Sequence, residues 1–198
     1  MKLFKKLNII YFIKQDIIIS IKYFNSIINI MNIDIYIKKT NKTYKTEYGI
    51  PFQCVELIRR FFSINIDLSF PDVIDAIDFF NKINSFFLLS NPNKNILLNT
   101  YSYPYTEHYS YYLRPGSILF WKYNKTYFKY GHVALIIKSD KKETIVIQQN
   151  LNPAIKKYNT QELFEKINNL KSKFLGIKIL SNKIMSKIYN IECNIIKI

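Results

Sequence analysis

The sequence predicts an α+β fold in which helices pack on an antiparallel β-sheet. Directly after Cys54, the apolar residues Val55, Ile58, Phe61 and Phe62 fall at the spacing of one buried helix face. Later in the chain, four short apolar segments read as strands joined by short loops, as in an antiparallel sheet: Ser117–Trp121, His132–Lys138, Thr144–Gln149 and Leu175–Leu180. The chain is 198 residues long and 48% hydrophobic, which is enough to bury a core within one domain.

We expect the domain to span residues 33–181, between an N-terminal extension at 1–32 and a tail at 182–198. The extension starts with lysines and a short apolar run, as signal peptides do, but Asp16 interrupts the run and no small-residue cleavage site follows. Two interpretations stay open for it: a helix or strand packed on the domain, and a signal-like or membrane-associated segment.

Three further elements have local signals. Ile33–Ile37 alternates apolar and polar residues, which predicts a strand entering the domain. Pro71 suits the first turn of a helix, and residues 73–80 continue with apolar residues on one face. Asn159–Glu162 resembles a capping box and predicts a short helix.

Cys54 lies where the first predicted helix begins. Unpaired backbone N–H groups and the positive end of the helix dipole favour a thiolate there, and a thiolate is the form that attacks a carbonyl. We therefore expect a lowered thiol pKa and a nucleophilic role. The alternative is a small buried residue at a helix start, because free cysteine is among the most buried residue types.

His132 opens a predicted strand, directly after Gly131, and the next strand runs into the polar trio Gln148, Gln149 and Asn150. The order of cysteine, histidine and polar residue is that of papain-like hydrolases. In those enzymes the histidine activates the thiol and the third group orients the histidine. His108, the other histidine, has no motif around it, and we expect no role for it.

The resemblance to a known family is closer than this order alone. Five blocks carry it: Phe52–Phe61, Phe70–Phe80, Arg114–Trp121, Tyr130–Ile136 with Gln148–Asn150, and Phe174–Gly176. They resemble CHAP domains, the cysteine- and histidine-dependent amidohydrolases/peptidases of the NlpC/P60 superfamily. Within that family they look most like the amidase half of glutathionylspermidine and trypanothione synthetase/amidases. The likeness extends over roughly residues 33–180.

The resemblance implies a papain-like fold with Cys54 as nucleophile, His132 as base and Gln148 as third catalytic residue. The family usually has glutamate where this chain has Gln148. Glutamine can accept a hydrogen bond from the imidazole but cannot offer it a negative charge. Gln53, Gln149 and Asn150 match substrate-binding or cleft positions.

Arg59 matches an arginine near the glutathionyl end of the substrate in the amidase branch. The competing interpretation is a surface arginine on the exposed face of the helix. Both stay open from the sequence.

The implied activity is amide hydrolysis through a thioester, with the Cys54 N–H, helped by Gln53, as oxyanion donor. The expected substrate is a small-molecule or peptide amide, such as a glutathione–polyamine conjugate or another γ-glutamyl amide. Most CHAP domains outside this branch cut bacterial cell-wall peptides. The alternative is a catalytically weakened structural or binding protein that kept the scaffold.

The composition bounds the partners. The net charge is +15, but the lysines are spread singly and accompany an AT-rich codon bias, so we do not expect nucleic-acid binding. The charge can instead steer an anionic substrate, and membrane contact is left open. A tyrosine-dense segment, Tyr101–Tyr112, is either a wall of the cleft or a surface loop.

The two cysteines form no CxxC motif, so we expect no zinc site, no disulfide and no cofactor. Two lone thiols favour a reducing compartment such as the cytoplasm.

Overall fold

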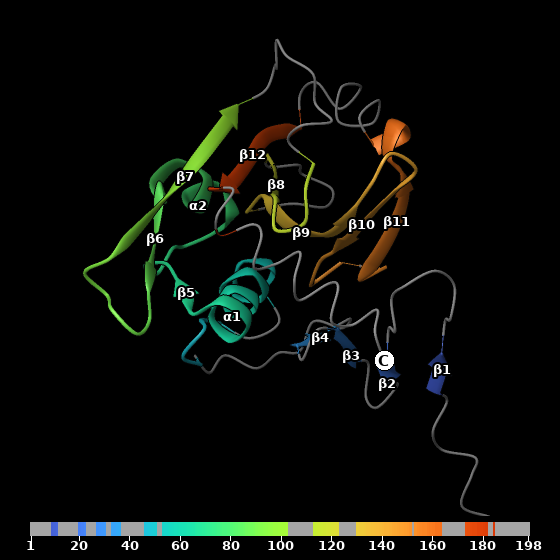
Figure 1. Cartoon of the computed structure of the whole chain (residues 1–198), viewed down its shortest axis with the longest axis horizontal. Helices are drawn as coiled ribbons and strands as arrows, with labels where there is room; N and C mark the ends of the chain where they lie inside the picture. Colours follow the sequence, from blue (N-terminus) through green and yellow to red (C-terminus); the bar gives the residue numbers. More distant parts are fainter. Residues whose placement is uncertain are drawn as a thin grey trace, which may run out of the picture.

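One antiparallel sheet organises the domain. The computed structural model describes residues 9–11, 20–22, 27–30, 33–36, 46–50, 53–102, 113–122, 130–151, 153–163, 173–181 and 184. The strands of the sheet are β5 (Leu68–Ser69), β6 (Ser85–Leu88), β7 (Asn95–Ser102), β8 (Ile118–Trp121), β9 (His132–Ser139), β10 (Glu143–Ile147), β11 (Ile155–Asn159) and β12 (Phe174–Leu180). Their spatial order is β11-β10-β9-β8-β12-β7-β6-β5, and every neighbouring pair is antiparallel (Figure 1).

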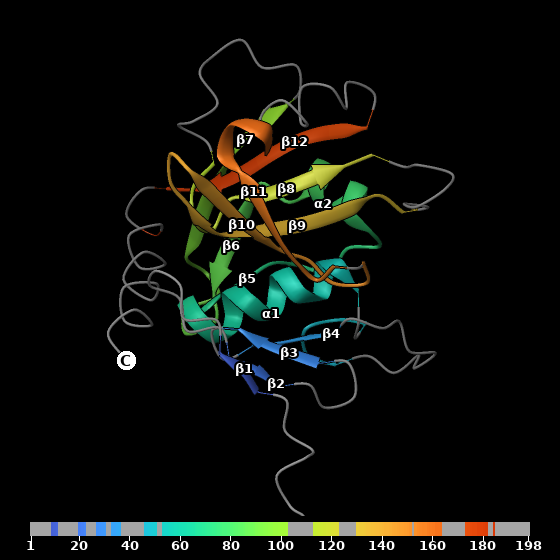
Figure 2. The same cartoon turned by 90° about the vertical axis from the view of Figure 1, so that its right-hand side faces the viewer.

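Two helices pack against this sheet. α1 (Cys54–Ile66) contacts β5 and β9, and α2 (Ala76–Lys82) contacts β8 and β9. Figure 2 shows α1 lying across one face of the sheet, with its axis close to β9. Because β9 touches both helices, the start of α1 and the start of β9 lie in the same part of the molecule.

A cluster of phenylalanine rings joins the helices to the sheet. Phe70 stacks on Phe79 and Phe86, with ring centroids 4.3 and 5.0 Å apart. Phe62 of α1 meets Phe86 edge-on, and Phe79 of α2 meets Phe120 of β8 edge-on. Burial of each such side chain contributes about 1.5–3 kcal/mol, so the cluster fixes how α1 and α2 sit on the sheet.

The β9–β10 hairpin contains a bulge. Ile145 pairs with Lys138, but Val146 pairs with Ile136, so Ile137 is an extra residue on β9. The bulge lies between the turn of the hairpin and the end of β9 at which His132 lies.

The predicted α+β fold is confirmed. The four strands expected in the second half of the chain are present as β8, β9, β10 and β12, with ends that differ by one or two residues. Strands β5, β6, β7 and β11 were not predicted from the sequence.

The start of the second helix was predicted wrongly. The helix begins at Ala76 and not near Pro71, because the Asp75 side chain caps it by accepting a hydrogen bond from the Asp78 N–H at 2.8 Å. The later cap signal was right: the Asn159 side chain accepts from the Gln161 N–H at 2.9 Å, where residues 160–163 form a helical turn.

The N-terminal segment contributes two short hairpins. β1 (Ile9–Tyr11) pairs with β2 (Ser20–Lys22), and β3 (Ile27–Ile30) pairs with β4 (Ile33–Tyr36), which contacts α1 (Figure 2). The strand expected at residues 33–37 is therefore confirmed as β4. No helix in the described part of the chain is both long and apolar enough to cross a membrane. Residues 103–112, with most of the tyrosine-dense segment and His108, and residues 185–198 lie outside the described ranges.

Candidate active site

Cys54 is the first residue of α1. Gln53, in extended conformation, is the N-cap, and its side chain makes no capping hydrogen bond. A tight turn precedes the helix, in which the N–H of Gly49 and the carbonyl of Thr46 pair at 3.1 Å. Gly49 has φ +120°, a conformation that favours glycine. The turn lies against α1, where the Tyr48 carbonyl accepts a hydrogen bond from Arg59 at 3.0 Å.

The Cys54 sulfur lies against backbone N–H groups from both α1 and β9. The N–H groups of Val133, Val55 and Cys54 itself favour the thiolate, whereas burial and the Asp75 carboxylate favour the thiol. Burial is the largest effect, and it raises the pKa of the Cys54 thiol to about 11. The lowered pKa expected from the helix N-terminus is therefore not found, because desolvation outweighs the N–H groups. The contact with Val133 places the sulfur beside the residue that follows His132.

His132 is the first residue of β9 and is buried. Burial lowers the pKa of its imidazole to about 4, partly offset by a hydrogen bond with Gln148. The Nε2 atom of His132 lies 3.2 Å from Oε1 of Gln148, and Nε2 of Gln148 donates to the Pro153 carbonyl at 2.7 Å. Because the second bond points the Gln148 oxygen at the ring, His132 carries its proton on Nε2. The basic lone pair is then on Nδ1.

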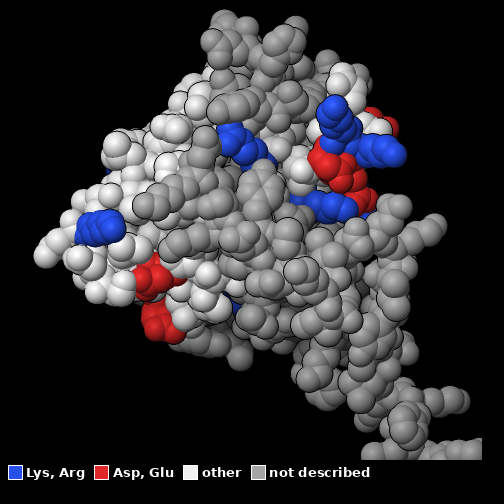
Figure 3. Space-filling model, viewed as in Figure 1, with Lys and Arg blue, Asp and Glu red and all other residues white. Residues whose placement is uncertain are grey.

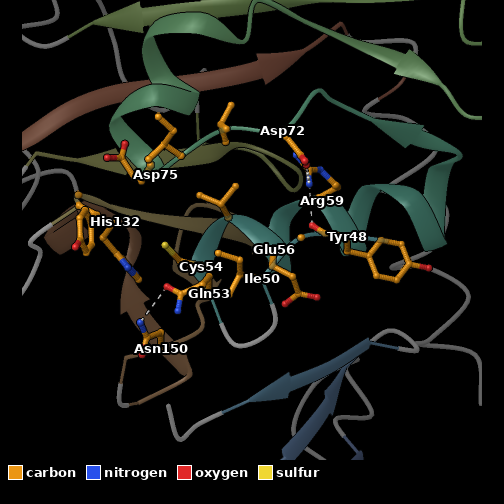
Figure 4. Close-up of a pocket in the computed structure, with 17 residues that line it drawn as sticks. Tyr48, Ile50, Gln53, Cys54, Glu56, Arg59, Asp72, Asp75, His132 and Asn150 are labelled. Atoms are coloured by element: carbon orange, nitrogen blue, oxygen red, sulfur yellow. Dashed lines mark hydrogen bonds and ion pairs between the residues drawn. The ribbon is translucent and has the colours of Figure 1, made fainter. Parts of the chain in front are cut away.

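Cys54 and His132 line one cleft of about 800 Å³ (Figure 4). Its walls come from the turn before α1, the first turns of α1, the segment leading to α2, and the start of β9. The residues that line it are Tyr48, Gly49, Ile50, Gln53, Cys54, Val55, Glu56, Arg59, Asp72, Val73, Ile74, Asp75, Ala76, Tyr130, Gly131, His132 and Asn150. A cleft of this size accommodates a small molecule or several residues of a peptide.

Gly131 brings the start of β9 close to its neighbours. With φ +70°, it has no room for a Cβ atom, which would lie 2.8 Å from both Ile77 Cγ1 and the Trp121 carbonyl oxygen. Gly131 lines the cleft, and close packing against β8 and α2 is the constraint that excludes a side chain.

The residues expected to bind substrate lie in different environments. Gln53 and Asn150 both line the cleft, and Asn150 Nδ2 lies 3.5 Å from Gln53 Oε1 (Figure 4). Gln149 does not line the cleft: it is fully buried beneath the start of α1, where it bonds to the Gln53 carbonyl and to Glu56.

Arg59 is buried, only 5% exposed, so the interpretation as a surface arginine is wrong. It lines the cleft, but its Nη1 donates to the Tyr48 carbonyl and to Asp72, at 3.0 and 2.7 Å (Figure 4). Nη2 donates to the Pro71 carbonyl at 2.8 Å, while Nε finds no hydrogen-bond partner among the described residues. Arg59 therefore ties two walls of the cleft together.

Sequence reasoning missed several residues of the cleft. Asp72 and Asp75 add carboxylates, and Ile50, Ile74 and Tyr130 add exposed apolar surface at its mouth. Most of them lie in segments that carry the family resemblance, but nothing in their local pattern showed that these segments meet in one cleft.

Within the described ranges, no three side chains of His, Cys, Asp or Glu are placed to hold a metal ion.

Comparison with known proteins assigns the family. No curated protein matches the chain. Residues 43–150, more than half of the chain, match the CHAP domain. The match includes Cys54, His132 and Gln148, and it confirms the resemblance to CHAP domains, whereas the closer likeness to glutathionylspermidine-type amidases stays a prediction. The chain therefore belongs to the CHAP domain family, whose members are typically amidases and peptidases of the NlpC/P60 superfamily.

Proposed function

We propose that the protein is a cysteine-dependent amidohydrolase or peptidase that cleaves an amide bond through a thioester. The observation that carries the proposal is the geometry of one cleft. The cleft is lined by a thiol at a helix start and an imidazole at a strand start, and the buried amide of Gln148, behind the imidazole, fixes its tautomer.

In the resting cleft both reactive groups are neutral, because the pKa of Cys54 is raised and that of His132 is lowered. Proton transfer then accompanies attack instead of preceding it. As the sulfur bonds to the substrate carbonyl carbon, His132 Nδ1 accepts the thiol proton and the C=O π electrons move to oxygen. The intermediate collapses, the C–N bond breaks, and the leaving amine takes the proton from His132.

The acyl group remains on Cys54 as a thioester. Water attacks its carbonyl carbon and gives a proton to His132, the C–S bond breaks, and the sulfur recovers the proton. The products are a carboxylic acid and an amine. As oxyanion donor in both halves we propose the backbone N–H of Cys54, at the first position of α1, with the side chain of Gln53, which lines the same cleft, as a second donor.

For the substrate we propose a glutathione–polyamine conjugate or a related γ-glutamyl or peptide amide. The likeness of the motifs to glutathionylspermidine-type amidases supports this choice. The cleft adds that Arg59 already holds Asp72, so a substrate carboxylate reaches the guanidinium only by displacing that side chain. Peptidoglycan amides, the substrates suggested by the family at large, are the second class to test.

A specific observation favours a second candidate function, a weakened CHAP-fold binding protein. The raised thiol pKa and the uncharged Gln148 both disfavour the thiolate–imidazolium pair. A protein that only binds its ligand would keep the cleft but form no acyl-enzyme.

Acyl-enzyme formation separates the two candidates. We would add p-nitrophenyl acetate and follow p-nitrophenol release together with the protein mass, comparing wild type with Cys54→Ser and His132→Ala. The hydrolase gains one acetyl group on Cys54, and each variant loses this reaction. Glutathionylspermidine and cell-wall peptides would then be screened as substrates. A wild-type protein that never becomes acetylated would leave only the binding function.

A further inference from the structure

Two charged residues of α1 point into the protein beneath the nucleophile. Glu56 and Arg60 are 4% and 8% exposed, and Gln149, next to them, is 0% exposed. Charged groups are rarely buried unless each is paired and hydrogen-bonded, because removing them from water costs several kcal/mol. Their presence one turn below Cys54 calls for a reason beyond the stability of the helix.

The three side chains form a closed ring of hydrogen bonds. Arg60 Nε donates to Glu56 Oε1 at 2.7 Å, and Arg60 Nη2 lies 3.4 Å from Glu56 Oε2 and 3.2 Å from Gln149 Oε1. Gln149 Nε2 closes the ring by donating to Glu56 Oε2 at 2.8 Å. Its second hydrogen bond, at 2.9 Å, goes to the carbonyl oxygen of Gln53.

That carbonyl belongs to the same planar peptide unit as the Cys54 N–H. In a trans peptide the C=O and N–H bonds point in opposite directions, so fixing one fixes the other. The Gln53 oxygen also accepts the first helical hydrogen bond, from the Leu57 N–H at 3.2 Å. Gln149 adds a second bond from the β10 side and removes the freedom of this peptide to rotate about the helix end.

The same short segment orients the other half of the site. Gln148 bonds to His132, Gln149 bonds to the Gln53 carbonyl, and Asn150 approaches the Gln53 side chain. Asn150 has φ +62°, an uncommon conformation for a residue other than glycine. Such backbone persists where the surroundings fix it, and it is often found at functional sites.

We propose that Glu56, Arg60 and Gln149 are positioning residues: their ring holds the Gln53–Cys54 peptide so that the Cys54 N–H can stabilise the oxyanion. This inference rests on the proposed function and adds three residues that act through the nucleophile peptide. Glu56 and Arg60 set the position of Gln149, and Gln149 sets the peptide.

Two probes of Cys54 separate this role from a general structural one. Acetylation by p-nitrophenyl acetate passes through an oxyanion, whereas alkylation by iodoacetamide is a direct displacement that forms none. We would measure both rates for wild type, Glu56→Gln and Gln149→Met. Thr144→Val serves as the control, because Thr144 is buried in a hydroxyl network with Ser139 and Thr160 at the other end of β10. Thermal melting checks that each protein is folded.

The ring predicts that Glu56→Gln and Gln149→Met slow acetylation at least about tenfold, since loss of one oxyanion donor typically costs about 10²–10³. Alkylation should fall by a clearly smaller factor, because the N–H groups of Val133 and Val55 still favour the thiolate when the Cys54 N–H is displaced. Thr144→Val should leave the ratio of the two rates unchanged. Gln149→Met keeps both charges of the ring, so the test holds even if Glu56→Gln does not fold.

Two results would overturn the proposal: equal losses in both rates, or no loss in acetylation. If the wild-type protein is alkylated but not acetylated, the proposed hydrolase function fails instead, and the variants are not the cause.

Discussion

Gln148 shows how one side chain sets both the strengths and the limits of this site. Its oxygen orients His132 and its nitrogen is held by the Pro153 carbonyl, so the imidazole is fixed in the tautomer that can accept the thiol proton. It contributes no charge, however, and the buried imidazole keeps a low pKa. In the proposed mechanism His132 is therefore oriented as a general base, but the thiol and the imidazole form no ion pair at rest.

Glutamate at position 148 should increase thiol reactivity and decrease stability. A carboxylate 3.2 Å from His132 Nε2 would raise the imidazole pKa by about 1–3 units, so Cys54 should alkylate faster at pH 6–7. Its second oxygen would face the Pro153 carbonyl without a proton to share, which lowers the melting temperature. Iodoacetamide labelling from pH 5 to 10 and thermal unfolding of Gln148→Glu test both effects. Gln148→Met cannot accept a hydrogen bond from the imidazole, so its Cys54 should not alkylate faster than in wild type.

His132 should make the protein sensitive to acid. Its pKa is about 4 when folded and about 6.5 when unfolded, so between these values the unfolded chain binds a proton that the folded chain does not. Stability from this group is therefore complete above pH 6.5 and is lost as the pH falls towards 4, by about 3 kcal/mol in total. Urea unfolding at pH 4–7 should show this slope in wild type and a smaller slope in His132→Gln. Equal pH dependence of the unfolding free energy in wild type and His132→Gln would contradict the assignment of this effect to His132.

At this scale the sequence predicted which residue types line the cleft but not their electrostatics. Cys54 and His132 could be found because each begins a regular element after a glycine-containing turn. The raised thiol pKa could not be found, because it comes from burial of Cys54 in the folded chain, which no local pattern reports. The Glu56–Gln149 contact joins residues 93 positions apart and was likewise invisible.

Among the secondary-structure elements, those that were predicted have clean apolar patterns, and those that were missed do not. β9 is buried along most of its length, whereas β7 alternates irregularly and leaves Leu97 73% exposed. β11 is an edge strand with two lysines, and β5 has only two residues. Pairing with neighbours, not local propensity, makes these segments strands. The start of α2 is determined by the Asp75 cap, and the prediction of an earlier start from Pro71 was wrong.

The start of β9 should tolerate no side chain at position 131. In Gly131→Ala the new Cβ would meet the Trp121 carbonyl oxygen at 2.8 Å, and φ +70° is unfavourable for alanine. We expect a loss of about 1–3 kcal/mol in unfolding free energy and slower acetylation, because β9 must shift and carry His132 with it. Lys138→Ala, near the other end of the same strand, is the control and should cost less, since its ion-pair partners Asp140 and Glu143 are 52% and 34% exposed and such pairs contribute little. If Gly131→Ala is as stable as wild type, the start of β9 can move to accommodate a side chain at no cost in unfolding free energy, and the prediction is wrong.

For the whole molecule, net charge and local charge differ. The chain carries +15, yet the cleft is lined by Glu56, Asp72 and Asp75 against a single arginine. On the face in Figure 3, positive and negative side chains also lie side by side near β10 and β11, where Lys138 and Lys157 pair with Glu143. Long-range attraction of anions therefore comes from the chain as a whole, not from the lining of the cleft.

Salt should reveal which field an approaching anion feels. Iodoacetate is anionic and iodoacetamide is neutral, and both alkylate Cys54. If the net charge dominates, raising the ionic strength from 10 to 300 mM should slow iodoacetate several-fold, because screening shortens to about 6 Å or less. Iodoacetamide provides the control and should be unaffected. Faster labelling by iodoacetate at high salt would mean that the carboxylates of the cleft dominate.

The extra residue Ile137 in the β9–β10 hairpin decides whether His132 and Gln148 lie on the same face of the sheet. Beyond it, Ile147 pairs with Leu135, so the next pair in register is Gln148 with Ala134, and His132 is two residues further along the same face. In the register that Ile145 and Lys138 share, Gln148 would instead be opposite Leu135, with its side chain on the other face. The position of His132 relative to Gln148 thus depends on whether the number of residues between the bulge and His132 is odd or even. A single-residue insertion or deletion between Ile137 and His132 would turn the imidazole away from the thiol, whereas one in the turn at residues 140–142 would leave the pair intact.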